Sequence, residues 1–288
     1  MEQILKRGTG VLLIDVTNSN PNGDPDMDSD PRIRQDGRGE ISPVSFKRKI
    51  RNLIEDKSTE LWKDIAAEMN LSEAAFGILE SKDTKRSEIK EMTQEEFLSR
   101  YWDARVFGST FLDEKREDKS FITTGVVQFG LGVSLDPVQI ERMTTTKVMA
   151  VAEDKGKGMA PLAFRIVSYG LYIMPFFINA TAAAKTHCTA KDIELLFRLI
   201  PYAYPETASY IRPQVFIRHA FYVEHGKARG TVNDFHIIEA LTPRKINDVQ
   251  GPAASWKDYD ESALMKNVEN LNKQIEGKAS PVKDLVMF

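Results

Sequence analysis

The stretch "FRIVSYGLYIMPFFINA", residues 164–180, decides the fold. It is almost continuously apolar, and its β-branched and aromatic side chains favour a strand over a helix. Its most apolar part, "LYIMPFFI" at 171–178, is far shorter than the roughly 20 residues that a membrane-spanning helix needs. We therefore expect one central strand, or a pair of strands, inside the sheet of a soluble protein.

Three other segments predict strands around this one. The segment "GVLLIDVT" at 10–17 is apolar and β-branched, and it ends at Asn, Pro and Gly residues that are typical of a loop. The segment "TTGVVQFGLGVS" at 123–134 alternates apolar and polar residues, as a half-buried strand does. The segment "PQVFIRHAFYVEH" at 213–225 predicts the last strand, after which the chain becomes polar.

Two amphipathic helices separate these strands. The first has Ser42 as a capping residue and Pro43 at the first helical position, and the second has Thr189 as a possible cap. Apolar residues recur at helical spacing in both, namely Phe46, Ile50, Leu53 and Ile54 in the first and Ile193, Leu196, Phe197 and Ile200 in the second. The order strand, helix, strand, strand, helix, strand predicts an α+β fold of the ferredoxin-like kind.

The 288 residues are expected to form a single domain with long insertions. The core, or palm, is predicted to comprise residues 8–56 and 121–225. Residues 57–120 are rich in Lys and Glu and predict a helical insertion, while 134–163 predict a loop or hairpin insertion. Within the latter, 144–164 is interpreted as a Gly/Lys loop without apolar anchors. Residues 226–288 form a C-terminal extension with one amphipathic helix at 262–277.

Composition limits the classes of function. The formal net charge of −3 gives no overall sign of nucleic-acid binding, so any site for a polyanion must be local. The single cysteine, Cys188, excludes an intramolecular disulfide and a cysteine-based zinc cluster. One cysteine in a chain of this length suits a reducing compartment, and we expect a cytoplasmic protein.

Four aspartates alternate in the loop after the first strand, at Asp24, Asp26, Asp28 and Asp30. An EF-hand counted from Asp24 would need Gly at position six and Glu at position twelve, but Ser29 and Gln35 stand there. We therefore expect no metal. Aspartates beside Pro and Gly usually build turns, and this is the favoured interpretation. A second possibility is that one of these carboxylates orients neighbouring arginines.

The residues that follow the aspartates are strongly basic. A run such as "KRKIR" at 47–51 is usually the solvated face of a helix. However, it directly follows a Gly/Arg loop, and free N–H groups and the dipole at a helix N-terminus favour phosphate. We predict that the loop arginines and one helix face bind a polyanion, through Arg32, Arg34 and Arg38 in the loop and Lys47, Arg48 and Arg51 on the side away from the apolar stripe.

A second basic segment, Lys155-Gly-Lys157-Gly-Met159, matches neither phosphate-binding fingerprint. It is either a flexible linker or a nucleic-acid contact, since glycines let a backbone approach a strand closely. The four histidines lack metal-ligand spacing, and no nucleophile motif is present. His187 and Cys188 are adjacent and would point apart, so they do not suggest a catalytic pair. We expect neither catalysis nor a cofactor.

Assembled in order, these pieces resemble the crRNA-binding backbone subunit of type I CRISPR Cascade complexes, in the RAMP superfamily and nearest to the Csd/Csh branch of subtypes I-C and I-B. The resemblance covers about residues 8–225. The matching pieces are "NPNGDPD" at 20–26, "PRI" at 31–33, "SFKRKIR" at 45–51, "DARVFGS" at 103–109, "GVVQFG" at 125–130, "GKGM" at 156–159 and "YGLY" at 169–172.

The resemblance implies a modified RRM-like palm with helical and hairpin insertions. It also implies several copies stacked along one crRNA, with other Cascade subunits as partners, target DNA recognised through the guide, and no catalysis. Lys47, Arg48 and Arg51 align with RNA-contacting helix positions, while Arg105, Phe107, Lys157 and Met159 belong to further matching pieces. The chain lacks an aromatic RNP motif, so bases need not stack on the sheet.

Two other functions stay open at this point. Backbone subunits of type III complexes cut target RNA with a loop aspartate and a divalent metal, and Asp24, Asp26 or Asp28 could take that role. A stand-alone binder of single-stranded RNA would be monomeric with or without RNA. For the basic helix, the pattern further predicts that Arg48→Ala with Arg51→Ala leaves the fold intact and weakens RNA binding.

Overall fold

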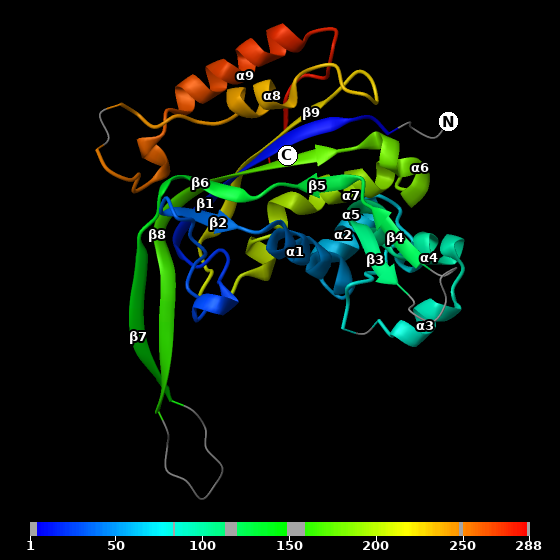
Figure 1. Ribbon diagram of the computed structural model, residues 1–288, viewed down its shortest axis with the longest axis horizontal. Coiled ribbons are helices and arrows are strands. Elements are labelled where there is room, and N and C mark those ends of the chain that lie inside the picture. The colour runs from blue at the N-terminus through cyan, green and yellow to red at the C-terminus, as the bar shows by residue number, and fades with distance from the viewer. Residues whose placement is uncertain (1–4, 83, 113–119, 149–158, 248–249, 287–288) are drawn as a thin grey trace, which may run out of the picture.

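The computed structural model describes residues 5–82, 84–112, 120–148, 159–247 and 250–286. A central sheet carries helices on both faces, and a long two-stranded ribbon projects away from it (Figure 1). No helix in these described ranges is long and apolar enough to cross a membrane.

The sheet is built around β8 (Met159–Ile178), one continuous strand of 20 residues. It pairs antiparallel with β1 (Gly8–Ser19) from Gly8↔Ile178 to Ser19↔Val167, and β1 pairs on its other side with β9 (Val215–Glu224). The strand order is β10-β9-β1-β8-β6-β2, with β5 and β7 also paired to β8. The remaining strands of this sheet are β2 (Arg38–Ile41), β5 (Val127–Phe129), β6 (Gly132–Pro137), β7 (Ile140–Val148) and β10 (Lys283–Asp284). Antiparallel pairing of β9, β1, β8 and then β5 and β6 is the ferredoxin-like order, which confirms the predicted α+β fold.

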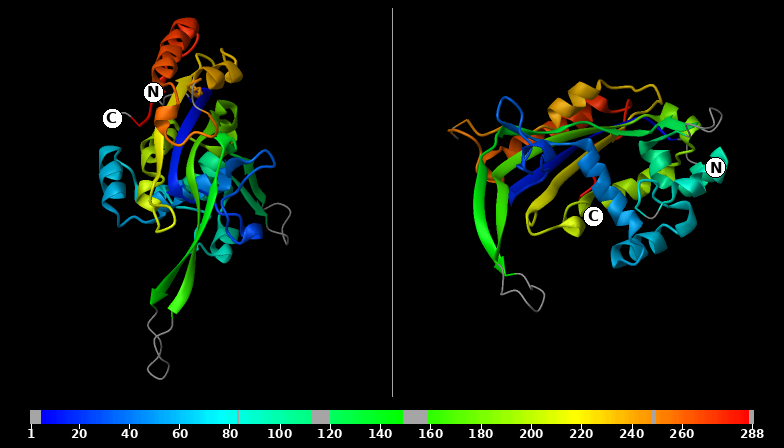
Figure 2. Two further views of the ribbon diagram at one scale, coloured as in Figure 1. Left: turned by 90° about the vertical axis from the view of Figure 1, so that its left-hand side faces the viewer. Right: turned by 60° about the horizontal axis from the view of Figure 1, so that its bottom comes forward.

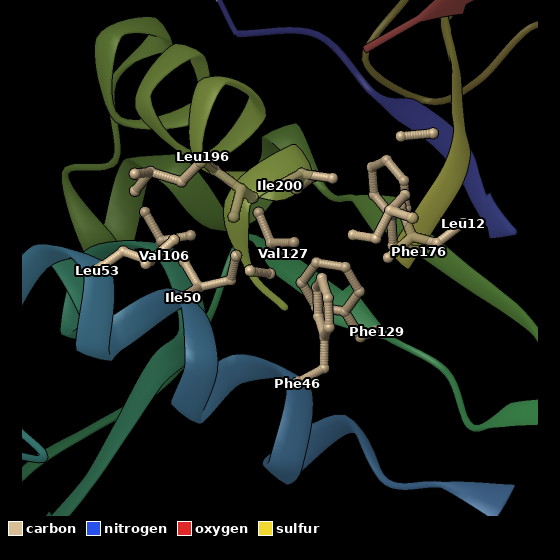
Figure 3. Close-up of a cluster of buried hydrophobic side chains, with 14 of the residues drawn as sticks. Leu12, Phe46, Ile50, Leu53, Val106, Val127, Phe129, Phe176, Leu196 and Ile200 are labelled. Atoms are coloured by element: carbon tan, nitrogen blue, oxygen red, sulfur yellow. The ribbon is translucent and has the colours of Figure 1, made fainter. Parts of the chain in front are cut away.

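One face of the sheet is covered by α1 (Pro43–Glu55) and α7 (Ala190–Leu199). Both helices begin at the predicted caps: Ser42 Oγ accepts from Ser45 N, and Thr189 forms a capping box with Asp192. Their apolar stripes meet the sheet in a fully buried cluster that includes Phe46, Ile50 and Leu196 (Figure 3). The periodicity in the sequence therefore located both core helices correctly.

The opposite face is covered by the C-terminal extension, with α8 (Asp234–Ala240) and α9 (Glu261–Ile275). A second buried cluster joins the sheet to these helices, through Leu13, Leu171 and Phe221 on the strands and Ile237, Leu264, Leu271 and Ile275 on the helices. Figure 1 shows α8 and α9 lying across the sheet on the side away from α1. Within the described residues, helices thus pack on both faces of the palm, which leaves little open sheet surface on which bases could stack.

The insertion after α1 is helical as far as Phe107, as predicted. Its helices are α2 (Glu60–Glu68), α3 (Arg86–Glu91), α4 (Gln94–Arg100) and α5 (Trp102–Phe107). It then continues into a separate two-stranded sheet of β3 (Gly108–Leu112) and β4 (Ser120–Thr124), so the helical prediction was wrong for its last part. A short α6 (Ala183–Thr186) follows β8.

The second insertion is a hairpin, formed by β7 and the first half of β8. Pairing runs from Ile140↔Val167 to Val148↔Met159, and the ribbon extends away from the palm (Figures 1 and 2). The interpretation of 144–164 as a loop was therefore wrong for 144–148 and 159–164. A ribbon in solvent is held by backbone hydrogen bonds rather than by an apolar face, and β-branched residues such as Thr144, Thr145 and Thr146 favour it.

Two buried ion pairs attach the helical insertion to the palm. Arg51 Nε on α1 donates to Asp103 Oδ2 on α5 at 2.8 Å, and Asp103 also accepts from Leu79 N at 2.7 Å. Arg105 on α5 donates from Nη2 to Asp192 Oδ1 on α7 at 2.7 Å and from Nε to Asp192 Oδ2 at 3.1 Å. The other Arg105 donors reach the carbonyl oxygens of Leu98, Ser99 and Ala75.

We predict that Arg105→Met lowers the free energy of unfolding by about 3 kcal/mol. Removing one partner of a buried pair leaves Asp192 charged and desolvated, and that cost exceeds the loss of packing. Urea denaturation monitored by circular dichroism measures the change. Arg198→Met is the control, because the partly exposed Arg198 pairs with the exposed Glu68 and Glu194 at the surface, so its loss should cost less than about 1 kcal/mol. Equal costs for the two variants would show that the buried pair does not fasten the insertion.

Candidate functional site

Helix α1 carries cations around most of its circumference, but not as predicted. Arg48 lies on the solvent side, where its guanidinium bonds Glu80 through the carbonyl oxygen and, at 3.5 Å, the carboxylate. Lys47 lies on one flank of the apolar stripe, with Nζ 5.1 Å from the centre of the Phe107 ring. Burial lowers the pKa of Lys47, and the nearby Arg51 charge lowers it further. Lys47 forms no ion pair with any residue that the structure describes.

Lys49, on the opposite flank of α1, is the most unusual cation. It is only 6% exposed, and its Nζ donates to Thr207 Oγ1 at 3.1 Å and lies 4.9 Å from the centre of the Tyr204 ring. Burial and then the charge of Arg212 lower the pKa of Lys49 to about 8. Neither Lys49 nor Arg212 has a carboxylate within ion-pair distance in the described part of the chain. Lys49 is buried and Arg212 is partly buried, and two neighbouring cations placed in this way without a counter-charge normally require an anion.

Several polar atoms around these two cations also lack a protein partner. Arg212 Nε, Tyr204 OH and Ser209 Oγ are buried and form no hydrogen bond with the described residues, and Asn20 Oδ1 on the adjoining end of β1 is in the same state. Asn20 N donates to Ile211 O at 2.8 Å, which places the end of β1 against this segment. Each orphaned group costs about 1–3 kcal/mol. We call Asn20, Lys49, Tyr204, Ser209 and Arg212 the Lys49 cluster. The donors of Lys49, Tyr204, Ser209 and Arg212 suit an anion with several oxygen atoms, whereas Asn20 Oδ1 can only accept a hydrogen bond.

The aspartate loop performs both of the roles considered for it. Asp24 accepts from Asp26 N at 3.1 Å and caps a one-turn helix, and Asp28 adopts a left-handed backbone with φ of 51°, so the loop is a turn as predicted. Asp30 is 8% exposed and pairs with Arg142 of β7 and, at 3.6 Å, with Arg165 of β8. A carboxylate of this loop therefore orients two arginines, and it fixes the base of the hairpin.

The loop arginines remain accessible. Arg32 lies 3.5 Å from Asp24, and Arg34 lies 3.9 Å from Glu40. Arg38 pairs with Asp36 at 2.7 Å, and both side chains are largely exposed. Exposed pairs of this kind contribute little, so these guanidinium groups can exchange their partners for another anion at small cost.

Three residues predicted as contacts are instead part of the protein interior. Arg51 is 4% and Arg105 is 6% exposed, and the ion pairs described above occupy them. The prediction that Arg51 lies opposite the apolar stripe is wrong, because the buried Asp103 draws it inward. Arg51→Ala would therefore strand Asp103 and disturb the fold. Phe107 is 7% exposed and packs edge-on against Trp102.

The remaining predicted contacts lie at the end of the hairpin. Lys155 and Lys157 are outside the described residues. Met159 is the first residue of β8, and its position is described for the backbone alone. Lys49 and Arg212 were missed. The position of Lys49 between Phe46 and Leu53, on the flank of the apolar stripe, could have indicated a partly buried cation. Nothing in the local sequence around Arg212 indicates that this residue lies beside α1.

The groups considered for catalysis have ordinary structural surroundings. Burial raises the pKa of the Cys188 thiol well above its usual range, which keeps it protonated. His219 Nδ1 lies 2.6 Å from Asp284 Oδ2, and His225 is completely buried. Within the described ranges, no group of three or more His, Cys, Asp or Glu side chains is placed to hold a metal ion.

Fold and site together define a ferredoxin-like palm with a helical insertion, a projecting hairpin and a cationic helix flank. The family model for "CRISPR-associated protein Cas7" matches residues 6–263, and the chain belongs to this family. A curated relative, "CRISPR-associated protein Cas7" of Haloferax volcanii, is 26% identical over 214 residues, which are 67% of this chain and 62% of the relative. The predicted family is thereby confirmed, while the Csd/Csh branch stays a prediction.

Solved structures show the same fold. A chain from a "CRISPR RNA-guided surveillance complex" superposes with a TM-score of 0.52 at 13% identity, and the match covers 95% of this chain and 86% of the other. A second chain, from a "CRISPR RNA-guided surveillance complex, pre-nicking", gives a TM-score of 0.54 at 14% identity and covers 94% and 90%. At such low identity the likeness concerns the fold alone.

We predict that Asp30→Asn loosens the base of the hairpin. The neutral amide cannot compensate the charges of Arg142 and Arg165, so the ribbon loses its ionic attachment to the palm. Limited trypsin digestion followed by mass spectrometry should then show cleavage within 140–167 several-fold faster than in the wild type. Asp26→Asn, in the same loop but without a side-chain ion pair, should leave the rate unchanged. A wild-type rate for Asp30→Asn would show that the backbone pairing alone positions the hairpin.

Proposed function

We propose that this protein binds guide RNA as the backbone subunit of a type I CRISPR interference complex. Membership of the Cas7 family supports the proposal. The single observation that carries it is the Lys49 cluster, where two cations lie near each other and no carboxylate of the described residues pairs with either. Phosphate fits this arrangement, because its negative charge would pair with the two cations and its oxygen atoms would accept hydrogen bonds from their unpaired donors.

In this proposal the RNA backbone follows the flanks of α1 and the preceding loop. Lys49 and Arg212 take one phosphate, while Lys47, Arg48, Arg32 and Arg34 neutralise the neighbouring ones. Arg48 exchanges Glu80 for phosphate as it does so. Contacts of this kind are independent of sequence, so recognition of target DNA is left to base pairing with the guide. The covered sheet supports this path, since the described residues leave bases little open β-surface on which to stack.

Several copies are proposed to line one guide, together with other subunits of the complex in the cytoplasm. The hairpin supports this, because it projects well beyond the palm and its base is fixed by Asp30 (Figure 2). A ribbon of this shape can reach over the RNA segment held by the next copy. A slightly anionic chain suits such a filament, since a strongly basic surface would bind RNA indiscriminately.

We propose no catalytic role. Asp24 caps its own turn and Asp30 is committed to two arginines, so neither carboxylate is free to bind a metal. Incubation of the assembled complex with matched target RNA and Mg²⁺ tests this directly. Intact target supports the proposal, and periodic cuts would instead assign the type III-like activity to Asp26 or Asp28.

We expect the protein co-expressed with a guide to elute as a large ribonucleoprotein with a high 260/280 nm absorbance ratio. A monomer, with or without RNA, would point to a stand-alone binder. Lys49→Met should weaken binding to a guide-length RNA at least ten-fold and reduce the slope of log affinity against log salt by about 0.7, the value for one phosphate contact on a single strand. Fluorescence anisotropy at several salt concentrations measures both.

Lys49→Met retains the aliphatic volume and removes an unpaired buried charge, so the free energy of unfolding should not fall. Lys63→Met is the matched control, because Lys63 is exposed on α2 and pairs with Glu60. An unchanged affinity and salt slope for Lys49→Met, with normal folding, would remove the Lys49 cluster from the RNA path.

RNA affinity should fall as the pH rises above about 8. The pKa of Lys49 is about 8 in the free protein, and a bound phosphate raises it, so below pH 8 the side chain is charged in both states. Above pH 8 the free side chain loses its proton and binding must take one up, which weakens affinity by up to about ten-fold per pH unit. Burial raises the pKa of Tyr204 well above its usual range, so its hydroxyl stays protonated at these pH values. Anisotropy at pH 7, 8 and 9 should show this loss in the wild type and a smaller one in Lys49→Met, and parallel profiles would contradict it.

A further inference from the structure

A second cavity lies on the other face of the sheet, where the segment after β9 meets the start of β1. Its volume is about 580 Å³, and it is lined by Arg7, Phe177, Ile238 and residues 229–235. Cavities of roughly 300–1,000 Å³ are the usual size for ligand sites. Because α8 and α1 cover opposite faces of the sheet, this cavity is separate from the Lys49 cluster (Figure 1).

The floor of the cavity is rigid. His225 is completely buried, and its Nδ1 accepts from Thr231 N at 3.1 Å and from Val232 N at 3.4 Å. The imidazole proton therefore sits on Nε2, which lies 3.1 Å from Thr9 Oγ1, and Thr9 donates in turn to Asp234 Oδ1 at 2.6 Å. Arg7 pairs with the same carboxylate. The charge of Asp234 is thus compensated within the floor, and no negative charge faces the cavity unpaired.

The segment at the rim is held in one conformation by two glycines. Gly230 has a φ of +88°, and a Cβ at Gly226 would lie 2.7 Å from Lys278 O. Gly226 N donates to Lys278 O at 2.9 Å, and Gly230 N donates to Lys227 O at 3.0 Å. The tight turn between these glycines presents Lys227 and Arg229 to solvent.

The groups that face outward are unpaired. Lys227 and Arg229 form no ion pair or side-chain hydrogen bond with the residues that the structure describes. Beside them, Phe235 on α8 is 81% exposed, more than any other large apolar side chain in the described ranges. A soluble protein has no internal reason to expose an aromatic ring next to two free cations and a cavity, and such a combination marks an interaction site.

We propose that this cavity binds one nucleotide of a single-stranded nucleic acid other than the guide. A base stacks on the Phe235 ring, and the flanking phosphates contact Arg229 and Lys227. Stacking of a base on an aromatic ring and contacts between cations and phosphates do not depend on the nucleotide sequence. The cavity has room for a single flat group. An acidic peptide would match the charges but would not need a rigid floor beneath one exposed ring.

The test uses guide-loaded protein and a fluorescent 12-nucleotide single-stranded DNA that is not complementary to the guide. Anisotropy should show binding, and Phe235→Ala or Lys227→Ala with Arg229→Ala should weaken it at least five-fold. Phe235→Trp should restore it, because a larger ring preserves stacking. These residues are exposed, so the variants should fold normally, which circular dichroism checks. Phe216→Ala is the control, since Phe216 is 49% exposed on β9 and does not line this cavity.

The result is independent of the proposed guide site, because Lys49→Met alters that site alone. The proposal is overturned if the oligonucleotide does not bind, or if it binds equally well to Phe235→Ala. It is also overturned if a poly-glutamate peptide binds at this cavity while the oligonucleotide does not. Lys49→Met loaded with guide at saturating concentration should bind the oligonucleotide as the wild type does, which would support two separate sites, whereas a matching loss of oligonucleotide binding would overturn the proposal.

Discussion

The buried pair of Arg105 and Asp192 is the interaction on which the rest of the structure depends. All of the guanidinium donors of Arg105 are used, and they reach α7 as well as the carbonyl oxygens of the helical insertion. The adjacent pair of Arg51 and Asp103 joins the insertion to α1. With α5 fixed in this way, Phe107 lies beneath Lys47 and Glu80 lies beside Arg48. The cations of α1 are thus positioned by an insertion that is remote from them in sequence.

The buried and partly buried cations fall into two groups, those that pair with a carboxylate and those that do not. Arg51 and Arg105 are buried with carboxylates, so their charges stabilise the fold only as long as both partners are present. Lys49 is buried and Arg212 is partly buried, with its Nε withdrawn from water, but neither has a carboxylate within ion-pair distance in the described part of the chain. Keeping these two charges unpaired lowers the stability of the free protein. An external anion that binds them would remove this free-energy cost, which explains why the protein keeps them. Arg229 is a different case, because it is exposed at the rim of its cavity and forms no ion pair with the described residues, whereas Arg7 beside the same cavity pairs with Asp234.

The sequence was sufficient for the features that depend on local order. The periods of the apolar residues located α1, α7 and the strands β1, β8 and β9, and the family motifs identified the fold. It was insufficient wherever a partner came from far along the chain. Arg51 was predicted to be exposed because its position on the helix lies away from the apolar stripe. Its side chain points inward because it pairs with Asp103, which is 52 residues further along the chain. Residues 134–163 were predicted as a loop or hairpin, but the sequence could not decide between the two, because the pairing of the hairpin comes from the backbone and leaves no apolar signature.

The C-terminal extension changes what this palm can do. A four-stranded sheet of the RRM kind normally keeps one face open for bases, and recognition then depends on aromatic side chains of the strands. Here Leu13, Leu171 and Phe221 occupy that face with α8 and α9, so the strands contribute to stability rather than to recognition. Nucleic acid can then approach only from helices, loops and edges, where contacts reach phosphate more readily than base edges. In the proposed function, a subunit of this construction holds a strand in a defined path without selecting its sequence, which is the property that a binder of variable guides would need.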